Sequence, residues 1–260
     1  MRPRYLNQIA SKNVGGLCAA LLNCSFILSL NTGIAYADED VDKDEEKSAY
    51  KITLSDYAAK DLRAQDLNAR TTIKNQEMWI GYYHDDASGF EQTRVGYERY
   101  DENEFLKLTT TVQAATHDFL GLALLTEIGG SVHAILGVSR TNLKPFDNIN
   151  FDPNDSVTYG AGIEFSKNND IAAYRVRDNR EIKGQQIDHI LMHYVTQTGN
   201  KTTFDLFNKS GTADIDGKSI SATGAAFTYD WPKYFIRAAY DPKVNFTQSY
   251  MTRLSIGMYF

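Results

Sequence analysis

Residues 250–260 of this 260-residue chain alternate between apolar side chains on one face and mostly polar or small side chains on the other. One face carries Tyr250, Thr252, Leu254, Ile256, Met258 and Phe260, and the other carries Met251, Arg253, Ser255, Gly257 and Tyr259. A period of two residues predicts a β-strand with two different environments. In a soluble sandwich the apolar face points inward. In a membrane barrel it faces lipid, and the polar face lines the lumen.

The same pattern begins near Asn75 and continues in segments separated by short runs of turn residues. Each segment approaches the ~9–11 residues that cross a membrane at a tilt. We therefore expect an all-β fold, a transmembrane antiparallel up-and-down barrel of about twelve strands. If the segment Phe119–Ile128 and its hairpin partner are not strands, the count falls to ten. The leucines of this segment do not settle which of its faces points outward. The predicted strands are 75–84, 90–100, 105–116, 119–128, 131–141, 157–167, 170–178, 186–197, 202–208, 219–230, 234–241 and 249–260.

A secreted sandwich is the main alternative for the fold. It would need a second sheet to cover its alternating aliphatic faces, whereas a closed barrel in lipid satisfies every backbone group by itself. The predicted connections also alternate between short turns and longer loops, as expected when both termini of the barrel lie in the periplasm. Small residues on the polar faces, such as Gly96, Gly160 and Gly162, are expected to leave lumen space or to permit strong coiling.

The first 37 residues are predicted to be a signal peptide. Basic residues precede an apolar run from Val14 to Leu30, and Ala35-Tyr36-Ala37 has the pattern of a cleavage site. Retention as a membrane anchor and lipoprotein processing at Cys24 are weaker alternatives. Cleavage would remove both cysteines and lower Lys plus Arg from 27 to 24 against 33 acidic residues, leaving a net charge of −9. Such a chain has no basic face for nucleic acid, so no nucleic-acid partner is expected.

Residues 38–74 are predicted to form an acidic N-terminal arm in the periplasm, ahead of a barrel that spans 75–260. Seven of the ten residues in Asp38–Lys47 are acidic, a composition typical of disorder. The stretch from Leu54 to about Leu67 has a helix-favouring composition, so one short helix is expected there. It would lie in the periplasm or plug the mouth of the barrel.

The segment Arg253–Phe260 resembles the C-terminal β-signal of Gram-negative outer-membrane proteins. In that family, alternating hydrophobic residues lead to a terminal Phe that the barrel-assembly machinery recognises. The segment Tyr159–Phe165, followed by a two-Asn turn and Tyr174-Arg175, is similar to hairpins of small porin-like barrels. The resemblance implies an outer-membrane location, contact with outer-membrane lipid, and Leu254, Ile256, Met258 and Phe260 as the assembly signal.

Charged residues of both signs fall on the predicted lumen face. If they line a narrow aqueous path, the protein is a small monomeric channel for ions or small hydrophilic solutes. If they pair and fill the interior, it is a structural or adhesive surface barrel without conductance. Glu127 with His133, and Glu164 with Arg175, are the expected filling contacts. The lumen-lining candidates are Arg94, Glu98, Lys107, Glu164, Arg175, Arg177, Asp230, Arg237 and Arg253, with Glu127 and Asp205 on the same faces.

No catalytic, cofactor or metal site is expected. His189 and His193 share a strand face but lie roughly 13 Å apart along it, too far to bind one metal ion. Some outer-membrane barrels are enzymes that act on lipid, and these need a nucleophile with a base. The compact His/acid pairs, His117-Asp118 and His84-Asp85, have no adjacent serine. A barrel enzyme is therefore the weakest functional hypothesis.

Overall fold

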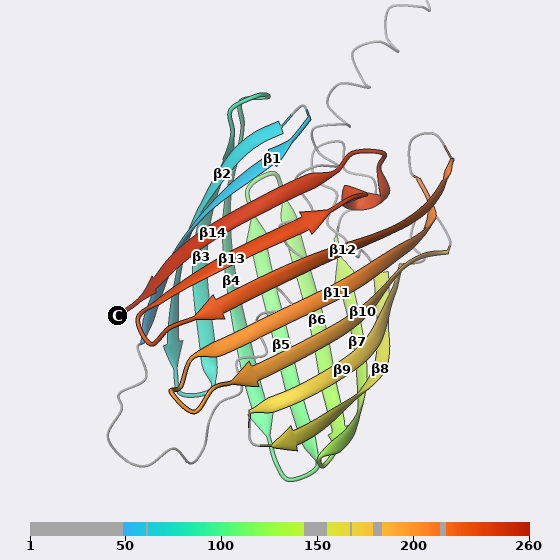
Figure 1. Ribbon diagram of the computed structural model, residues 1–260. Helices are drawn as coiled ribbons and strands as arrows, with labels where there is room; N and C mark the ends of the chain where they lie inside the picture. The colour runs from blue at the N-terminus through green and yellow to red at the C-terminus, as the bar shows by residue number, and fades with distance from the viewer. Residues whose placement is uncertain (1–48, 61, 143–154, 167, 179–183, 214–216) are drawn as a thin grey trace, which may run out of the picture.

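The computed structural model describes residues 49–60, 62–142, 155–166, 168–178, 184–213 and 217–260, and these form one closed antiparallel β-barrel (Figure 1). Each strand pairs with the next in sequence, and β1 pairs with β14 to close the barrel. The strands are β1 (Tyr50–Ala59), β2 (Leu62–Ile73), β3 (Gln76–Asp85), β4 (Phe90–Glu102), β5 (Leu106–Ala115), β6 (Phe119–Gly129), β7 (Val132–Thr141), β8 (Asp155–Ser166), β9 (Asn169–Asp178), β10 (Gln185–Val195), β11 (Lys201–Thr212), β12 (Ser219–Asp230), β13 (Tyr234–Asp241) and β14 (Met251–Tyr259).

The barrel has fourteen strands rather than the predicted ten to twelve. The twelve predicted strands correspond to β3–β14, and the additional hairpin is β1–β2. The predictions of a helix between Leu54 and Leu67 and of a barrel that starts at residue 75 were therefore wrong. Pairing of β1 with both β14 and β2 gives every strand residue of this segment a cross-strand partner, which outweighs its local helix preference. The predicted signal peptide and the run Asp38–Lys47 lie outside the described residues.

The two ends of the barrel differ in the length of their connections. The short-turn end holds Tyr50, Phe260 and the turns that join β2–β3, β4–β5, β6–β7, β8–β9, β10–β11 and β12–β13. The long-loop end holds the other connections, the longest of which follow β7 and β13. The connection between β5 and β6 is an exception, because it is a tight turn in which His117 and Asp118 both have positive φ. Two such residues are typical of a type I′ hairpin.

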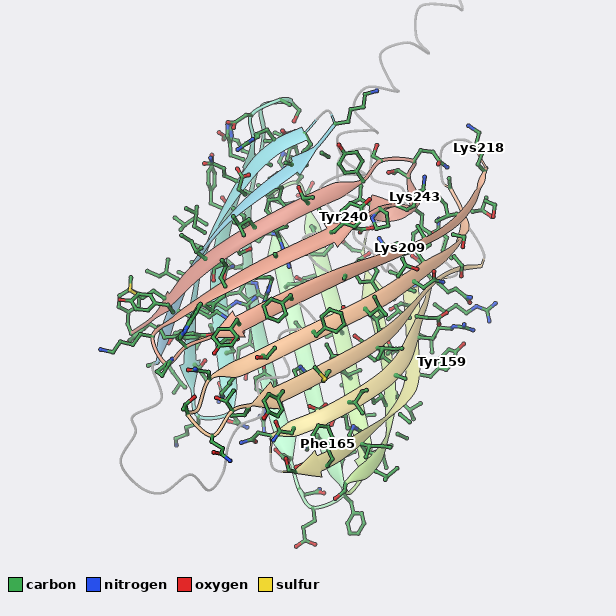
Figure 2. The ribbon with its side chains drawn as sticks, viewed as in Figure 1. Tyr159, Phe165, Lys209, Lys218, Tyr240 and Lys243 are labelled. Carbon is green, nitrogen blue, oxygen red and sulfur yellow. The ribbon has the colours of Figure 1, made fainter. Side chains whose placement is uncertain are left out.

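Apolar side chains cover the outer surface of the barrel. In β6, Leu120, Leu122 and Leu124 are exposed while Phe119 and Gly121 are buried, which settles the facing of this strand. Aromatic residues lie toward both margins of the apolar surface, with Tyr159 and Tyr240 toward the long-loop end and Phe165 toward the short-turn end (Figure 2). This arrangement is typical of a lipid-facing barrel. In the part of the chain that is described, no helix is long and apolar enough to span a bilayer.

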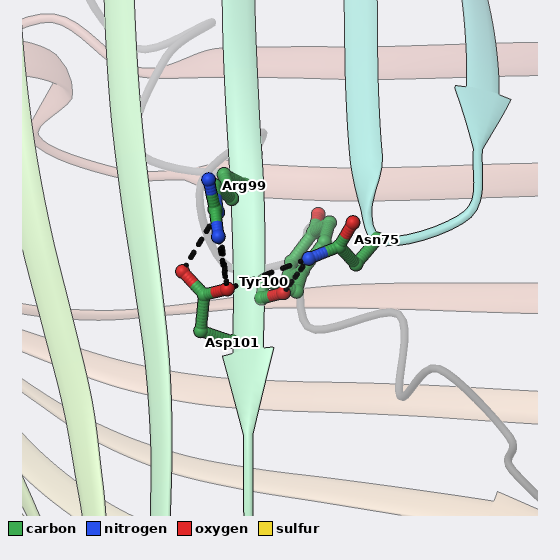
Figure 3. Close-up of polar contacts among 4 residues, drawn as sticks. All are labelled: Asn75, Arg99, Tyr100 and Asp101. Carbon is green, nitrogen blue, oxygen red and sulfur yellow. Dashed lines mark hydrogen bonds and ion pairs between the residues drawn. The ribbon is translucent and has the colours of Figure 1, made fainter.

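The β2–β3 turn is fastened to β4 at the short-turn end (Figure 3). The Asn75 amide Nδ2 donates to the Tyr100 carbonyl at 2.8 Å and to the Asp101 carboxylate at 3.4 Å. Arg99 donates to the same carboxylate through Nε at 2.9 Å and Nη2 at 2.8 Å. The Asn75 contacts hold the β2–β3 turn against β4. Arg99 orients the Asp101 carboxylate that Asn75 contacts.

Inward-facing rings lie over glycines on the neighbouring strand. An ideal Cβ built on Gly96 would fall 2.0 Å from the Trp79 ring, and one on Gly162 would fall 2.3 Å from the His133 ring. Glycine is required at such close approaches. The expected lumen space beside these glycines is therefore filled by rings. Among the described residues the directly paired examples are Trp79–Gly96, His133–Gly162, Phe207–Gly224 and Phe235–Gly257.

Candidate functional site

The lumen is the candidate functional site, because charged side chains from most strands meet there. Two regions can be distinguished. We call Lys51, Arg70, Arg94, Arg237 and Arg253, on β1, β2, β4, β13 and β14, the arginine region. We call Glu127, His133, Asp170, His189, His193 and Asp205, on β6, β7 and β9–β11, the histidine region.

Most cations of the arginine region contact an acidic or aromatic side chain. Arg94 forms an ion pair with Asp66, and Arg70 Nη1 donates to Glu77 Oε1 at 2.5 Å. The Arg70 guanidinium also lies 5.1 Å from the centre of the Trp79 ring, within the range of a cation–π contact. The side chains of both ion pairs are less than one-fifth exposed, so water screens these pairs weakly.

The same region continues across the β1–β14 seam. The Lys51 ammonium lies 4.4 Å above the Phe235 ring, and the Tyr259 hydroxyl donates to Asp230 at 2.6 Å. Arg237 Nε donates to Thr228 Oγ1 at 2.9 Å. The Arg253 guanidinium lies 5.9 Å from the Tyr57 ring, while its Nε and Nη2 have no hydrogen-bond partner among the described residues.

Carboxylates and imidazoles pair across strands in the histidine region. The Nδ1 atom of His189 lies 3.0 Å from Asp205 Oδ1, and that of His193 lies 2.8 Å from Asp170 Oδ1. The Nε2 atom of His133 lies 3.7 Å from Glu127 Oε2, so these two residues meet as predicted. The His189 ring also stacks on Tyr174 with centroids 4.7 Å apart.

The structure places most of the predicted lumen residues on the inner face. Glu98, Arg237 and Arg253 are buried there. Glu164 lies between the exposed, outward-facing Ile163 and Phe165 and therefore points inward. Arg94, Lys107, Glu127, Asp205 and Asp230 share the inner face.

Arg175 and Arg177 do not line the lumen, which corrects the prediction for β9. The buried residues of this strand are Asp170, Ala172 and Tyr174, so the arginines at the alternate positions face outward. Arg175 Nε donates to Asp188 Oδ1 at 2.5 Å, and the expected contact of Arg175 with Glu164 is absent from the described interactions of both residues. Both arginines lie toward the long-loop end of β9. Beyond the apolar surface a charged residue can face outward without contacting lipid. The inner face of this part of β9 is occupied by Tyr174.

Four charged lumen residues were not predicted, three of them because β1 and β2 were left out of the predicted barrel. Lys51, Asp66, Arg70 and Glu77 all contribute to the arginine region, although only Glu77 lay in a predicted strand. A signal for β1 is present in the sequence, because Tyr50, Ile52 and Leu54 alternate with Lys51, Thr53 and Ser55.

The connection between β13 and β14 folds into the long-loop end of the lumen. Its short 3-10 helix, η1 (Val244–Phe246), buries Val244 against a cluster that includes Tyr57 and Tyr83. Phe246 packs into a second cluster with Ile187, Phe207, Ala213 and Ile220. This connection therefore touches both the β1–β3 wall and the β10–β12 wall. Most of the connection between β7 and β8 lies outside the described residues.

A buried ion pair holds this connection in place. The Lys209 ammonium lies 2.6 Å from Asp241 Oδ2 and donates to the Lys243 carbonyl at 3.3 Å. Both side chains of the pair are at most 4 % exposed. Lys209 also lies 5.6 Å from the centre of the Phe246 ring. The ion pair joins β11 and β13 directly beneath η1.

Within the described ranges, no group of three or more His, Cys, Asp or Glu side chains is arranged to hold a metal ion. His84, outside the lumen, contacts Asp86 at 3.2 Å and Glu91 at 3.4 Å on the outer face of the β3–β4 hairpin. These contacts belong to an exposed loop margin.

Comparison with solved structures finds outer membrane protein Omp33 of Acinetobacter baumannii, with a TM-score of 0.54 and 11 % sequence identity over 82 % of this chain and 98 % of that one. The chain has the fold of an outer-membrane β-barrel. Weaker similarities, which carry no argument here, are to the KdgM porin (TM-score 0.41, 10 % identity, 81 % and 99 % covered) and to Salmonella typhi OmpF in complex with daunomycin (0.44, 11 %, 81 % and 96 %).

No protein-family model matches the sequence, and a search of curated proteins finds no match. The similarity to Omp33 therefore concerns the fold alone.

Proposed function

We propose that this protein is an outer-membrane channel for ions or small hydrophilic solutes. The observation that carries the proposal is the lumen of the fourteen-stranded barrel. It is lined by charged side chains of both signs, in the arginine region and in the histidine region. Barrels of eight strands are filled by their side chains, whereas those of sixteen to eighteen leave an aqueous channel. Fourteen strands with a charged lining lie nearer to the second group.

The inward-folded β13–β14 connection controls the width of this channel at the long-loop end. Val244 and Phe246 are buried between opposite walls, so the mouth is narrow in this conformation. Release of the connection would widen the mouth without altering the charged lining. The short-turn end is then the periplasmic end, as expected for a barrel whose longer connections are extracellular.

Planar-bilayer recording of the refolded protein tests the channel directly. The protein with V244S and F246S should give larger conductance steps than the unaltered protein, because the apolar anchors of the connection are lost. Tyr250→Ser is the matched control, since Tyr250 lies in the same connection but is exposed. Absence of conductance steps in both proteins, after insertion has been verified, would exclude a channel.

A filled barrel without conductance is the second candidate, favoured by the depth of burial in the lumen. Asp205 is 3 % exposed and Arg253 is 5 % exposed, so these charges have little contact with bulk water. In that case the interior groups serve stability, and the exposed connections carry the function, such as adhesion. The same recordings decide between the two candidates.

We also propose that the end of β14 is recognised by the barrel-assembly machinery. Leu254, Ile256, Met258 and Phe260 are all exposed on the outer face, and the Phe260 amide donates to the Tyr50 carbonyl at 2.9 Å. Phe260→Ala should reduce the heat-modifiable, folded form in cell membranes. Phe105→Ala, which alters an exposed aromatic at the same end, should not. Equal amounts of folded protein for both variants would contradict the proposal.

A further inference from the structure

A cavity of about 110 Å³ lies in the lumen against the wall formed by β4–β10. Its walls are mainly apolar, with Leu125, Ile135, Ala172 and Leu191 among the lining residues. Glu98, Glu127, Asp170 and His133 add charged or titratable groups to the same lining. A small apolar chamber with three carboxylates is different from the ion-paired arginine region.

The three carboxylates of the cavity are not equally satisfied. Glu98 accepts hydrogen bonds from the hydroxyls of Thr111, at 2.6 Å, and Tyr100. Asp170 is paired with His193 at 2.8 Å. In contrast, Glu127 Oε2 has no hydrogen-bond partner among the described residues, although its side chain is only 9 % exposed.

Glu127 therefore has an unsatisfied acceptor in a partly open cavity. The His133 Nε2 atom lies 3.7 Å from Glu127 Oε2, which is too long for a hydrogen bond. Burial of a carboxylate oxygen without a donor is costly in free energy. The Tyr174 hydroxyl, also without a partner in the described part of the chain, lines the same cavity. Both groups can take part in hydrogen bonds with a ligand.

Two glycines on β8 give this site its shape. The His133 ring approaches Gly162, and Tyr174 approaches Gly160, more closely than any Cβ would allow. The His133 ring consequently lies over Gly162 at the cavity wall, and the Tyr174 backbone and Cβ pack directly on Gly160. The cavity is thus built from specific close packing between β7, β8 and β9.

We propose that this cavity binds a small organic ammonium ion with a short apolar tail. An ammonium group carries three donors and no acceptor, so it can donate to Glu127 Oε2, while the aliphatic lining buries the tail. A cavity of about 150 Å³ holds benzene, so this partly open cavity of about 110 Å³ accommodates an alkyl tail of a few carbons. An anion is disfavoured by the three carboxylates. The inference rests on the cavity and does not require conduction.

Calorimetric titration of the full-length protein, refolded in a non-ionic detergent, tests this site with n-butylammonium chloride. Heats measured with empty micelles are subtracted. We expect saturable binding by the unaltered protein and a loss of at least about tenfold in affinity for E127Q, because a charge-assisted hydrogen bond is removed. E104Q makes the same charge change at an exposed position in the β4–β5 turn and should bind like the unaltered protein.

A second variant separates the shape of the cavity from its charge. Ala123→Leu fills part of the cavity and keeps Glu127, so it should also weaken binding. Heat-modifiable migration verifies that each variant is folded, and a variant that fails this check is replaced by comparison of ligands on the unaltered protein. There, n-butylammonium should bind at least about tenfold more tightly than 1-butanol or butyrate.

Three results would overturn the site: no saturable binding by the unaltered protein, equal affinity for 1-butanol, or unchanged affinity in E127Q. The channel and the site fail separately. A protein that binds n-butylammonium but gives no conductance steps contradicts only the channel, whereas one that conducts without binding contradicts only the site.

Discussion

The arginine region and the histidine region differ in how their buried ionisable side chains are stabilised. Arg94 and Arg70 are paired with carboxylates and remain charged under all ordinary conditions, because a guanidinium does not lose its proton in proteins. An imidazole can be neutral, so His189 can share a hydrogen bond with Asp205 without carrying a charge. Loss of a partner is therefore expected to cost far more in the arginine region.

Asp66→Ala should have the largest effect on stability. It leaves the Arg94 guanidinium buried without its carboxylate, and an uncompensated buried charge costs about 3–5 kcal/mol. Urea unfolding of the refolded protein, followed by tryptophan fluorescence, measures this loss. Asp56→Ala removes the partner of Arg63 in an exposed ion pair on the same hairpin and should cost less than about 1 kcal/mol. Similar losses for both variants would contradict the role of burial.

Asp205→Ala should lower the free energy of unfolding by about 1–3 kcal/mol, the cost of leaving a buried polar group unsatisfied. The loss is smaller than for Asp66→Ala because a neutral imidazole, unlike a guanidinium, leaves no uncompensated buried charge. The same urea experiment gives both values. If Asp205→Ala proved as costly as Asp66→Ala, the proposed difference between the two regions would be wrong.

Gly160→Ala tests whether packing, rather than charge, stabilises the histidine region. The added Cβ would fall 2.3 Å from the Ala173 carbonyl oxygen and 2.4 Å from Tyr174 Cβ. We expect a loss of about 1–2 kcal/mol from this overpacking. Gly130→Ala is the matched control, since a Cβ there meets nothing within 4 Å. An unfolding midpoint that is the same for both variants would show that the sheet adjusts freely.

Removal of a single lumen charge should have the smallest effect, a change in ion selectivity. The direction of this change should differ between the arginine region and the histidine region. In a conducting barrel, Arg253→Ala should shift the reversal potential in a salt gradient toward cation selectivity, whereas Glu127→Gln should shift it toward anion selectivity. The change in permeability ratio is expected to be about twofold, because neighbouring charges remain. Shifts of the same sign for both variants would show that the two regions do not line a common path.

Much of the barrel could be predicted from the sequence. The twelve strands from residue 75 onward, their order and their alternating connections follow from the period-two pattern and its turn residues. The first hairpin could not be recognised in the same way. On β2, Arg63 and Gln65 face outward while Leu62 and Ala64 are buried, so the apolar face of the strand changes sides along its length.

The contents of the lumen were predictable only in part. The alternation of side chains correctly predicted Glu98, Arg237 and Arg253 on the inner face. For Arg175 and Arg177, near the long-loop end of β9, the same rule predicted the inner face incorrectly. A charged residue can face outward where its strand extends past the lipid. The local sequence pattern does not show where along a strand the lipid ends. The cavity depends on close packing of Gly160 against Tyr174 on β9 and of Gly162 against the His133 ring on β7, which is a property of strand register.

The seam between β1 and β14 has a consequence for how the chain folds. Ser55 and Ser255 share a hydrogen bond of 2.8 Å across it, although they lie 200 positions apart. Among the described strands, every other pairing joins neighbours in sequence. Local hairpins form with little loss of chain entropy, whereas the seam requires closure of the whole loop. Folding is therefore expected to proceed as a growing curved sheet whose first and last edges remain unpaired until the final step.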